Sequence, residues 1–406
     1  MMASGLNVIL RPLFVLTKNN ILIAGLSYAL TISLANYLGP TEFGLYSLTL
    51  LIASLLSIII NFGTEQTASV NFSKNKNADL ILHRVLFIRF TIVGVCLIPI
   101  TFIYQNDLLI LFFIFSILLS NFNLAFYYEI TRDNERYSYI YLCERLIYIL
   151  AAFALIFTGT LNLTWVFILL GVVTTLSYIF QYRDASVYKI IKGTKENVFT
   201  IELLAQNFPL MVVGLSMFAF GGFSRLILEQ KLGQTSLGIY SAGWQLIAIG
   251  TIFQSQVGRI WRIRISETVV AGDLKSLLNE FKMYLVFVIC PMLILSLVFW
   301  RYSDLIVATI FSVEFIELRD LIPSFGIYLV VISLSGLVDM LWIAVEKNTS
   351  FMTIKIIFSC ILLLFLWGFS NGFGMLEFVN LTIGVHFCSV VALFLIWLFK
   401  FRKRLN

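Results

Sequence analysis

The sequence predicts an all-α polytopic membrane protein with twelve transmembrane helices in two six-helix halves. The chain is 60% hydrophobic and only 12% charged, whereas soluble domains contain about 25% charged residues. Apolar runs of about twenty residues, the length of a membrane-spanning helix, recur along the whole chain. Their continuous apolar character excludes a β-barrel, whose strands alternate. A third observation is a phrase that occurs twice, at 37–47 and at 231–241.

The expected spans follow from the apolar runs and from the charged residues that separate them. Their ranges are 21–38, 43–62, 85–104, 108–128, 137–158, 162–182, 207–228, 237–257, 281–300, 321–344, 351–370 and 376–399. No charged segment precedes the first run and no small-residue cleavage site follows it. We therefore expect the first helix to be retained, and not to serve as a signal peptide. The segment 301–320 is expected to lie along the outer membrane surface.

Lysine and arginine are distributed unequally between the two sets of loops. One set carries most of them, near 74–84, 132–136, 183–195, 262–282 and 347, and in the C-terminal KFRKR. The opposite loops hold Lys231, Arg301 and Arg319. Because cytoplasmic loops carry the positive excess, both termini and the basic loops are expected in the cytoplasm. The net charge of +6 is then explained without a nucleic-acid partner.

The repeated phrase reads YLGPTEFGLYS at 37–47 and KLGQTSLGIYS at 231–241, an offset of 194 residues. Each copy joins two expected spans at the outer side, where a tight turn needs glycine. Six spans separate the copies, so the two halves have the same orientation and are related by a pseudo-two-fold axis along the membrane normal. We expect lobes at 1–190 and 191–406, with the binding site between them and with alternating access.

These residues also carry a family resemblance. The pattern LGxxxxGxYS is followed by NFGTEQTASVNFSK at 61–74, and its second copy is preceded by SRLILEQ at 224–230. Together they resemble the polysaccharide flippases of the multidrug/oligosaccharidyl-lipid/polysaccharide (MOP) exporter superfamily, and the Wzx type, the O-antigen flippase, most of all. Ser224 departs from the family, which often has an acidic residue before the arginine of span 7. The chain also has no room for the fourteen spans of lipid II flippases.

The resemblance, which covers the whole chain, implies a cargo and a location. The cargo is an undecaprenyl-diphosphate-linked oligosaccharide, moved from the cytoplasmic to the periplasmic leaflet of the bacterial inner membrane. The polymerase and chain-length proteins of the same pathway are the implied partners.

Arginines inside the spans are the expected cargo contacts. A charge in mid-membrane costs roughly 2.5–3.5 kcal/mol, so each needs a reason. A diphosphate is bound bidentately by arginine, and we predict contacts from Arg89, Arg145 and Arg225. The alternative for Arg89 and Arg225 is snorkelling of the side chain to the headgroups. For Arg145 the alternative is a structural pair with another helix.

Vectorial transport without ATP needs an ion, and H⁺ and Na⁺ remain open. No P-loop occurs, and neither a cofactor nor a metal site is expected. The candidates for ion coupling or gating are Glu65, Glu129, Glu144, Asp339, Arg259 and Lys355. Glu65 and Arg259 are equivalent under the repeat, and we hypothesise that they pair when the cytoplasmic side closes. Solvated charges at the ends of loops are the alternative for this pair.

Two other classes of protein stay open on the sequence alone. An O-antigen polymerase would be expected to carry a large periplasmic loop, and an acyltransferase a catalytic histidine motif. The chain has short outer loops, and neither His83 nor His386 lies in a motif. A drug/cation antiporter of the same superfamily would favour a dominant acidic cavity, whereas here basic residues within the spans are as prominent as acidic ones.

Overall fold

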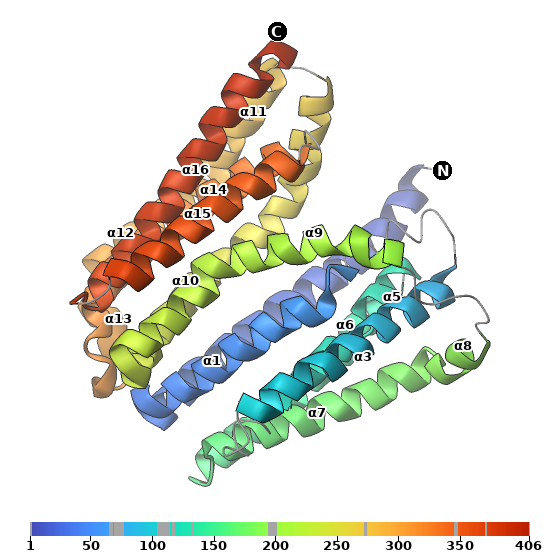
Figure 1. Cartoon of the computed structure of the whole chain (residues 1–406), viewed down its shortest axis with the longest axis horizontal. Helices are drawn as coiled ribbons and strands as arrows, with labels where there is room; N and C mark the ends of the chain where they lie inside the picture. The colour runs from blue at the N-terminus through green and yellow to red at the C-terminus, as the bar shows by residue number, and fades with distance from the viewer. Residues whose placement is uncertain are drawn as a thin grey trace. The chain divides into compact units, whose positions relative to one another are not determined.

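The computed structural model describes residues 2–64, 68, 77–103, 114–115, 118–131, 133–193, 201–271, 274–344, 348–369 and 372–405. Within these ranges all regular elements are helices, so the all-α prediction is confirmed (Figure 1). The α-helices are α1 (Met2–Asn61), α3 (Ala78–Ile103), α5 (Ala125–Ile130), α6 (Asn134–Phe157), α7 (Leu163–Asp184), α8 (Val187–Gly193), α9 (Ile201–Phe218), α10 (Ser224–Ala271), α11 (Leu274–Tyr284), α12 (Cys290–Arg301), α13 (Ser303–Ile310), α14 (Leu318–Ala344), α15 (Asn348–Phe369) and α16 (Met375–Leu405). Short 3₁₀-helices are η1 (Leu119–Phe122) and η4 (Val313–Phe315), and π-helices are η2 (Ala219–Phe223) and η3 (Leu285–Ile289).

Among the described residues, eight helical stretches are long and apolar enough to cross a membrane. Two of them are unusually long, Leu22–Asn61 with 40 residues and Asn207–Ala248 with 42. Each joins two helices across a glycine with non-helical dihedral angles, Gly39 in α1 and Gly233 in α10. Part of the expected span 108–128, at 108–113 and 116–117, lies outside the described residues, so the count of twelve stays a prediction.

The helix bounds agree closely with the apolar runs. Helix α7 begins at Leu163 because Asn162 caps it, accepting a hydrogen bond from the backbone N–H of Trp165 at 2.9 Å. The preceding turn contains Gly159 at a positive φ of 67°, a conformation that glycine adopts without strain. Between the expected spans 281–300 and 321–344, the chain forms the short helices α13 and η4.

The contacts divide the chain into two compact units. Unit 1 comprises Met1–Thr31 and Thr49–Leu215, and unit 2 comprises Ile32–Leu48 and Ser216–Asn406. Unit 2 therefore includes the kinked turn of α1, while the rest of α1 belongs to unit 1. The predicted lobes, 1–190 and 191–406, assign this turn and α9 differently and stay a prediction.

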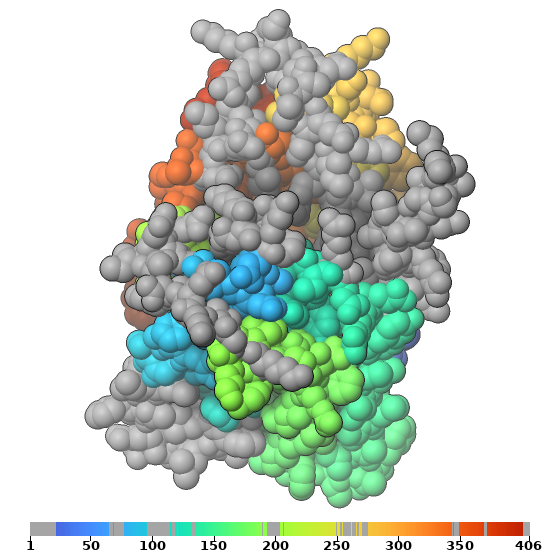
Figure 2. All heavy atoms as spheres, turned by 90° about the vertical axis from the view of Figure 1, so that its right-hand side faces the viewer, coloured from blue at the N-terminus to red at the C-terminus, as the bar shows by residue number. Residues whose placement is uncertain are grey.

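The core of unit 1 forms where α3, α5 and α8 meet. Leu82, Leu86 and Leu124 are almost completely buried there. Figure 2 shows the face on which α3, α6 and the α7–α8 corner come together. At this corner Asp184 accepts a hydrogen bond from the Tyr128 hydroxyl at 2.8 Å and pairs with Arg136. These polar contacts close the end of the apolar bundle.

The core of unit 2 surrounds α14, which packs against α10, α12 and α16 (Figure 1). Trp342 of α14 is fully buried, and its indole N–H donates to the carbonyl of Leu393 in α16 at 3.1 Å. Tyr284, also fully buried, donates its hydroxyl to the carbonyl of Ser333 at 3.2 Å. Polar groups on the packed helices thus find partners on neighbouring helices, as membrane interiors require.

Candidate cargo-binding and ion-coupling sites

A π-helical segment positions Arg225 in unit 2. The sequence AFGGF forms η2, and α10 follows from Ser224. A π-turn changes the register of the helix and leaves carbonyl groups free for side chains, a feature common at functional sites. Here the Arg225 Nε donates to the carbonyl of Gly221, and the Ser224 hydroxyl donates to that of Phe220 at 3.1 Å. The local backbone therefore holds one edge of the guanidinium.

Aromatic rings form one side of the Arg225 environment. The guanidinium carbon lies 4.8 Å from the ring centroid of Trp244, close enough for a cation–π interaction. Trp244 in turn packs against Tyr240 and Tyr328, with ring centroids 6.3 and 5.4 Å away. The Tyr328 hydroxyl lies 3.4 Å from Nδ1 of His386. We call this set, Arg225, Tyr240, Trp244, Tyr328 and His386, the arginine–aromatic cluster.

Arg225 has no ion-pair partner among the described residues. Its contacts there are the Gly221 carbonyl and the Trp244 ring. The residue is partly buried. A guanidinium within a membrane span, held by one edge and unpaired with a carboxylate, is suited to bind an anion bidentately.

Arg89 is placed differently. It is 0% exposed, and its Nη1 donates to the carbonyls of Asn121 at 2.6 Å and Asn123 at 3.2 Å. Its guanidinium carbon also lies 5.2 Å from the Phe126 ring centroid. These contacts join α3 to η1 and to the turn that follows it. They direct the cation into the core of unit 1. The side chain does not snorkel, and its contacts give it a structural role.

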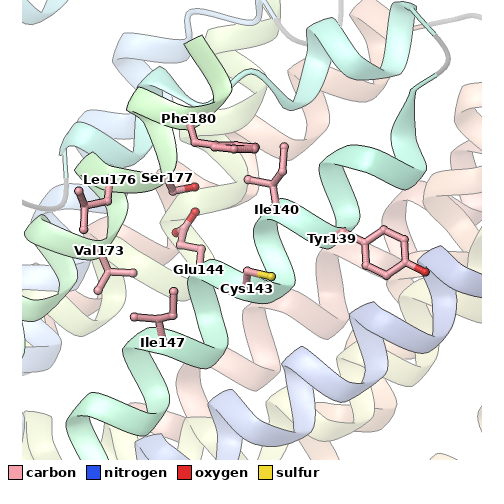
Figure 3. A pocket seen from close by; sticks show the side chains of 9 residues that line it. All are labelled: Tyr139, Ile140, Cys143, Glu144, Ile147, Val173, Leu176, Ser177 and Phe180. Carbon is pink, nitrogen blue, oxygen red and sulfur yellow. The ribbon is translucent and has the colours of Figure 1, made fainter. Parts of the chain in front are cut away.

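Glu144 lies in an apolar groove of about 450 Å³ between α6 and α7 of unit 1. Figure 3 shows its carboxylate directed from α6 toward Ser177 on α7. The walls are apolar, with Ile140 and Ile147 from α6 and Phe180 from α7. Ser177 also accepts a hydrogen bond from Gln181 at 3.1 Å. The groove thus combines one buried carboxyl group with a hydrocarbon lining.

Arg145, the neighbour of Glu144 on α6, is directed along its own helix. Its guanidinium carbon lies 5.0 Å from the ring centroid of Tyr141, which is one helical turn earlier. Arg145 does not line the groove. These two adjacent charges therefore point in different directions.

Asp339 and Lys355 form a buried ion pair between α14 and α15. Lys355 Nζ lies 3.1 Å from an Asp339 carboxylate oxygen and donates to the Ser335 hydroxyl at 3.2 Å. The side chains are 19% and 6% exposed, respectively. The sequence named both residues as candidates but did not predict that they pair.

The remaining candidates are not brought into either site. Glu129 is exposed near the end of α5. Glu65 and the side chain of Arg259 lie outside the described residues, so their hypothesised pairing stays a prediction. The sites predicted from the sequence did not include Tyr240, Trp244 and Tyr328. The spacing of four residues between Tyr240 and Trp244 was a signal, because it places both rings on one helical face.

The solved structures that this chain resembles are transporters. An inward-facing MATE family multidrug resistance transporter of the MOP superfamily matches with a TM-score of 0.70 and 11% identity, over 94% of each chain. The lipid II flippase MurJ, in an inward closed conformation, matches with a TM-score of 0.70 and 15% identity, over 97% of this chain and 89% of MurJ. A MOP superfamily transporter from Pyrococcus furiosus has a TM-score of 0.60 and 11% identity, over 97% and 95% of the two chains. The fold is therefore that of the MOP superfamily.

A sequence profile described as polysaccharide biosynthesis protein matches residues 9–258, more than half of the chain. The chain belongs to this polysaccharide biosynthesis protein family. No curated protein sequence gives a significant match. The resemblance to MOP-type polysaccharide flippases is confirmed by the family and the fold together. The solved structures that share the fold are transporters and a flippase rather than enzymes.

Proposed function

We propose that this protein is a flippase for an undecaprenyl-diphosphate-linked O-antigen oligosaccharide, working by ion-coupled alternating access. It acts in the bacterial inner membrane with both termini in the cytoplasm, beside the polymerase and chain-length proteins of the pathway. The family and the MOP fold support a flippase of this general kind. The observation that supports a diphosphate-linked sugar as the cargo is the arginine–aromatic cluster around Arg225.

The cluster combines the two chemistries that such a cargo presents. Arg225 offers a cation to the diphosphate without a competing carboxylate among the described residues. Trp244 offers an aromatic ring, the surface on which the C–H faces of sugars stack. Arg225 is therefore our first choice for the cargo contact, and Arg145 is the second. Arg89 ranks last, because its guanidinium is turned toward the Asn121 and Asn123 carbonyls.

Glu144 is the coupling residue we favour. A coupling carboxyl group must be able to gain and lose its ion as the protein cycles. Asp339 already has a fixed counter-charge in Lys355 at 3.1 Å. Glu144 has Ser177 and the charge of Arg145 nearby but no close ion pair among the described residues, and it has a groove beside it. We therefore assign coupling by H⁺ or Na⁺ to Glu144 ahead of Asp339 and Glu129.

Binding and flipping of the cargo by Arg225 variants test the proposal. Arg225→Gln removes a bidentate, charge-assisted contact and should lower flipping by about 10- to 100-fold. Arg225→Lys keeps the charge but loses the two-pronged geometry of the guanidinium. Its flipping rate should lie between that of the parent protein and that of Arg225→Gln. Arg301→Gln is the matched control, because this exposed arginine also lies beside a ring, 5.6 Å from the Tyr302 centroid.

The assay is complementation of a flippase-deficient strain, scored by the return of O-antigen. Flipping of a fluorescent lipid-diphosphate oligosaccharide in proteoliposomes measures the same step directly. Lipid-linked oligosaccharide that stays at the cytoplasmic face despite normal expression would refute the proposal. Equal flipping by Arg225→Gln and Arg301→Gln would refute the role of the cluster.

A drug/cation antiporter is the second candidate, and the groove around Glu144 favours it. An apolar groove of about 450 Å³ with one carboxyl group fits a hydrophobic monocation. Uptake of tetraphenylphosphonium into energised proteoliposomes separates the two candidates. Uptake that is lost in Glu144→Gln, together with no movement of the oligosaccharide lipid, would favour the antiporter.

A further inference from the structure

Helix α11 has one face packed into the core of unit 2 and one face exposed. Leu277 and Tyr284 are 2% and 0% exposed and belong to a core cluster that they share with residues of α14. Lys275, Leu278 and Lys282 are exposed. Their spacings of three and four residues place them together on the other face of the helix. We call these three residues the lysine stripe.

The exposed face continues into the apolar part of the same helical stretch. Helix α11 is followed directly by η3 and then by α12, without an intervening loop. Leu285 and Val286 follow Lys282 at spacings of three and four residues and are 42% and 58% exposed. From Leu285 up to Arg301 the sequence contains no charged residue. The lysine stripe is therefore the charged end of a face that is otherwise suited to contact lipid.

The length of this stretch places the lysine stripe at the membrane surface. The candidate span Lys275–Arg301 contains 27 residues, which corresponds to about 40 Å of helix. The hydrocarbon core of a bilayer is about 30 Å thick, and the bilayer with its headgroups is about 40–45 Å thick. With Arg301 at one boundary of the core, Lys282 lies about 28 Å away, close to the other boundary, and Lys275 lies about 10 Å further out. The stripe thus begins at the boundary and extends through the headgroup layer.

The positive charges of the stripe are not neutralised within the described part of the chain, where neither lysine forms an ion pair or a hydrogen bond. Glu280 is the acidic residue of α11, and its spacings from Leu277 and Tyr284 place it on the packed side of the helix. Lys400, an exposed residue near the C-terminal end of α16, donates to the Ser350 hydroxyl at 3.1 Å. This end of α16 and α11 lie at the same end of unit 2 (Figure 1), so Lys400 adds to the positive charge there.

We propose that the lysine stripe is a binding surface for the headgroups of anionic phospholipids, such as phosphatidylglycerol. An ammonium group attracts the phosphate of the headgroup, and each lysine near a membrane surface contributes about 1 kcal/mol. Leu278, Leu285 and Val286 contact the acyl chains of the same lipids. A soluble acidic protein fits less well, because the stripe runs without a break into a face at the depth of the hydrocarbon core. The proposal does not depend on the cargo.

Fluorescence quenching at Leu278 measures which lipid occupies the stripe. Leu278→Cys is introduced into a chain whose native cysteines are replaced by serine, and the thiol is labelled with bimane. The protein is reconstituted into mixed vesicles of phosphatidylglycerol and phosphatidylcholine, with one of the two lipids brominated as the quencher. We expect phosphatidylglycerol to be preferred about 25-fold, about fivefold for each lysine. The preference should weaken in about 1 M salt, where the Debye length is about 3 Å.

Charge variants test whether the lysines cause the preference. Lys275→Gln and Lys282→Gln should each lower it about fivefold, and the double variant should abolish it. Asn279→Lys adds a charge at an exposed position of the same face and should raise it by a similar factor. Lys192→Gln is the matched control, because it removes an exposed lysine from α8 in unit 1, and it should leave the preference unchanged. Native mass spectrometry of the chain with its own cysteines, which counts retained phosphatidylglycerol, repeats the comparison without a label.

Four results would overturn the proposal. They are equal quenching by the two lipids, a preference that survives the loss of both lysines, a loss in Lys192→Gln as large as that in Lys282→Gln, and displacement of brominated phosphatidylglycerol by a small fraction of undecaprenyl diphosphate. The last result would assign the stripe to the cargo instead. A protein that shows the expected lipid preference but moves no oligosaccharide lipid would refute the proposed function and leave this surface intact.

Discussion

Breaking the ion pair between Asp339 and Lys355 should destabilise unit 2 strongly. In Lys355→Met the ammonium group is lost, while the carboxylate of Asp339 keeps its largely enclosed position at 19% side-chain exposure. Removal of one partner of a buried ion pair costs about 3–5 kcal/mol. The remaining exposure of Asp339 puts the expected loss near the lower end, about 3 kcal/mol. The double variant Asp339→Asn/Lys355→Met buries no net charge and should lie within about 1 kcal/mol of the parent.

The measurement is a double-mutant cycle on the purified protein in detergent, from denaturant or thermal unfolding curves. Lys400→Met is the control, because this exposed lysine also donates to a serine hydroxyl, that of Ser350 at 3.1 Å, but has no ion pair within the described part of the chain. The unfolding midpoint of Lys400→Met should not move. If Lys355→Met matched Lys400→Met, or if the double variant were no more stable than Lys355→Met alone, the pair would not carry the stability assigned to it.

Three further predictions concern unfolding free energies, measured in the same way. Arg89→Met should cost about 2–4 kcal/mol, because the carbonyls of Asn121 and Asn123 lose a charged donor; an unchanged stability would show that the guanidinium is not structural. Gly233→Ala should cost about 1–3 kcal/mol through its positive φ, and a cost no larger than that of Gly384→Ala would contradict the strain argument. Asn162→Ala should cost about 1 kcal/mol by removing the cap of α7, whereas Asn162→Ser should restore most of the loss.

The sequence predicted the helices well because the apolar runs that span a membrane are local features. The expected spans 137–158 and 162–182 correspond to α6, Asn134–Phe157, and α7, Leu163–Asp184. Hydropathy alone fixes such bounds, since the cost of a charge in the bilayer sets where a span ends. The turns at Gly39 and Gly233 could also be predicted from a local pattern, because a glycine between two apolar runs indicates a turn.

Side-chain partners were harder to predict because they are distant in the sequence. Arg89 was expected to contact cargo, yet its carbonyl partners are 32 and 34 residues away, in a turn whose path hydropathy does not reveal. Asp339 and Lys355 were both named, but only the packing of α14 against α15 brings them together. Arg225 was named for its charge. The aromatic rings around it, and the absence of a carboxylate partner among the described residues, required the structure.

The turns 37–47 and 231–241 contact each other within unit 2, and this contact explains several positions at which the duplicated phrase is identical or differs. Gly44 and Gly238 are identical because each meets a backbone carbonyl, and Thr41 and Thr235 because they meet each other on the local axis. Pro40 and Gln234 differ, yet each contributes to the contact only a carbonyl oxygen, which any residue supplies. The identity of these threonines and glycines thus follows the contact between the two copies. A tight turn alone would demand glycine at the kink, but it would not demand a second glycine five residues later in both copies.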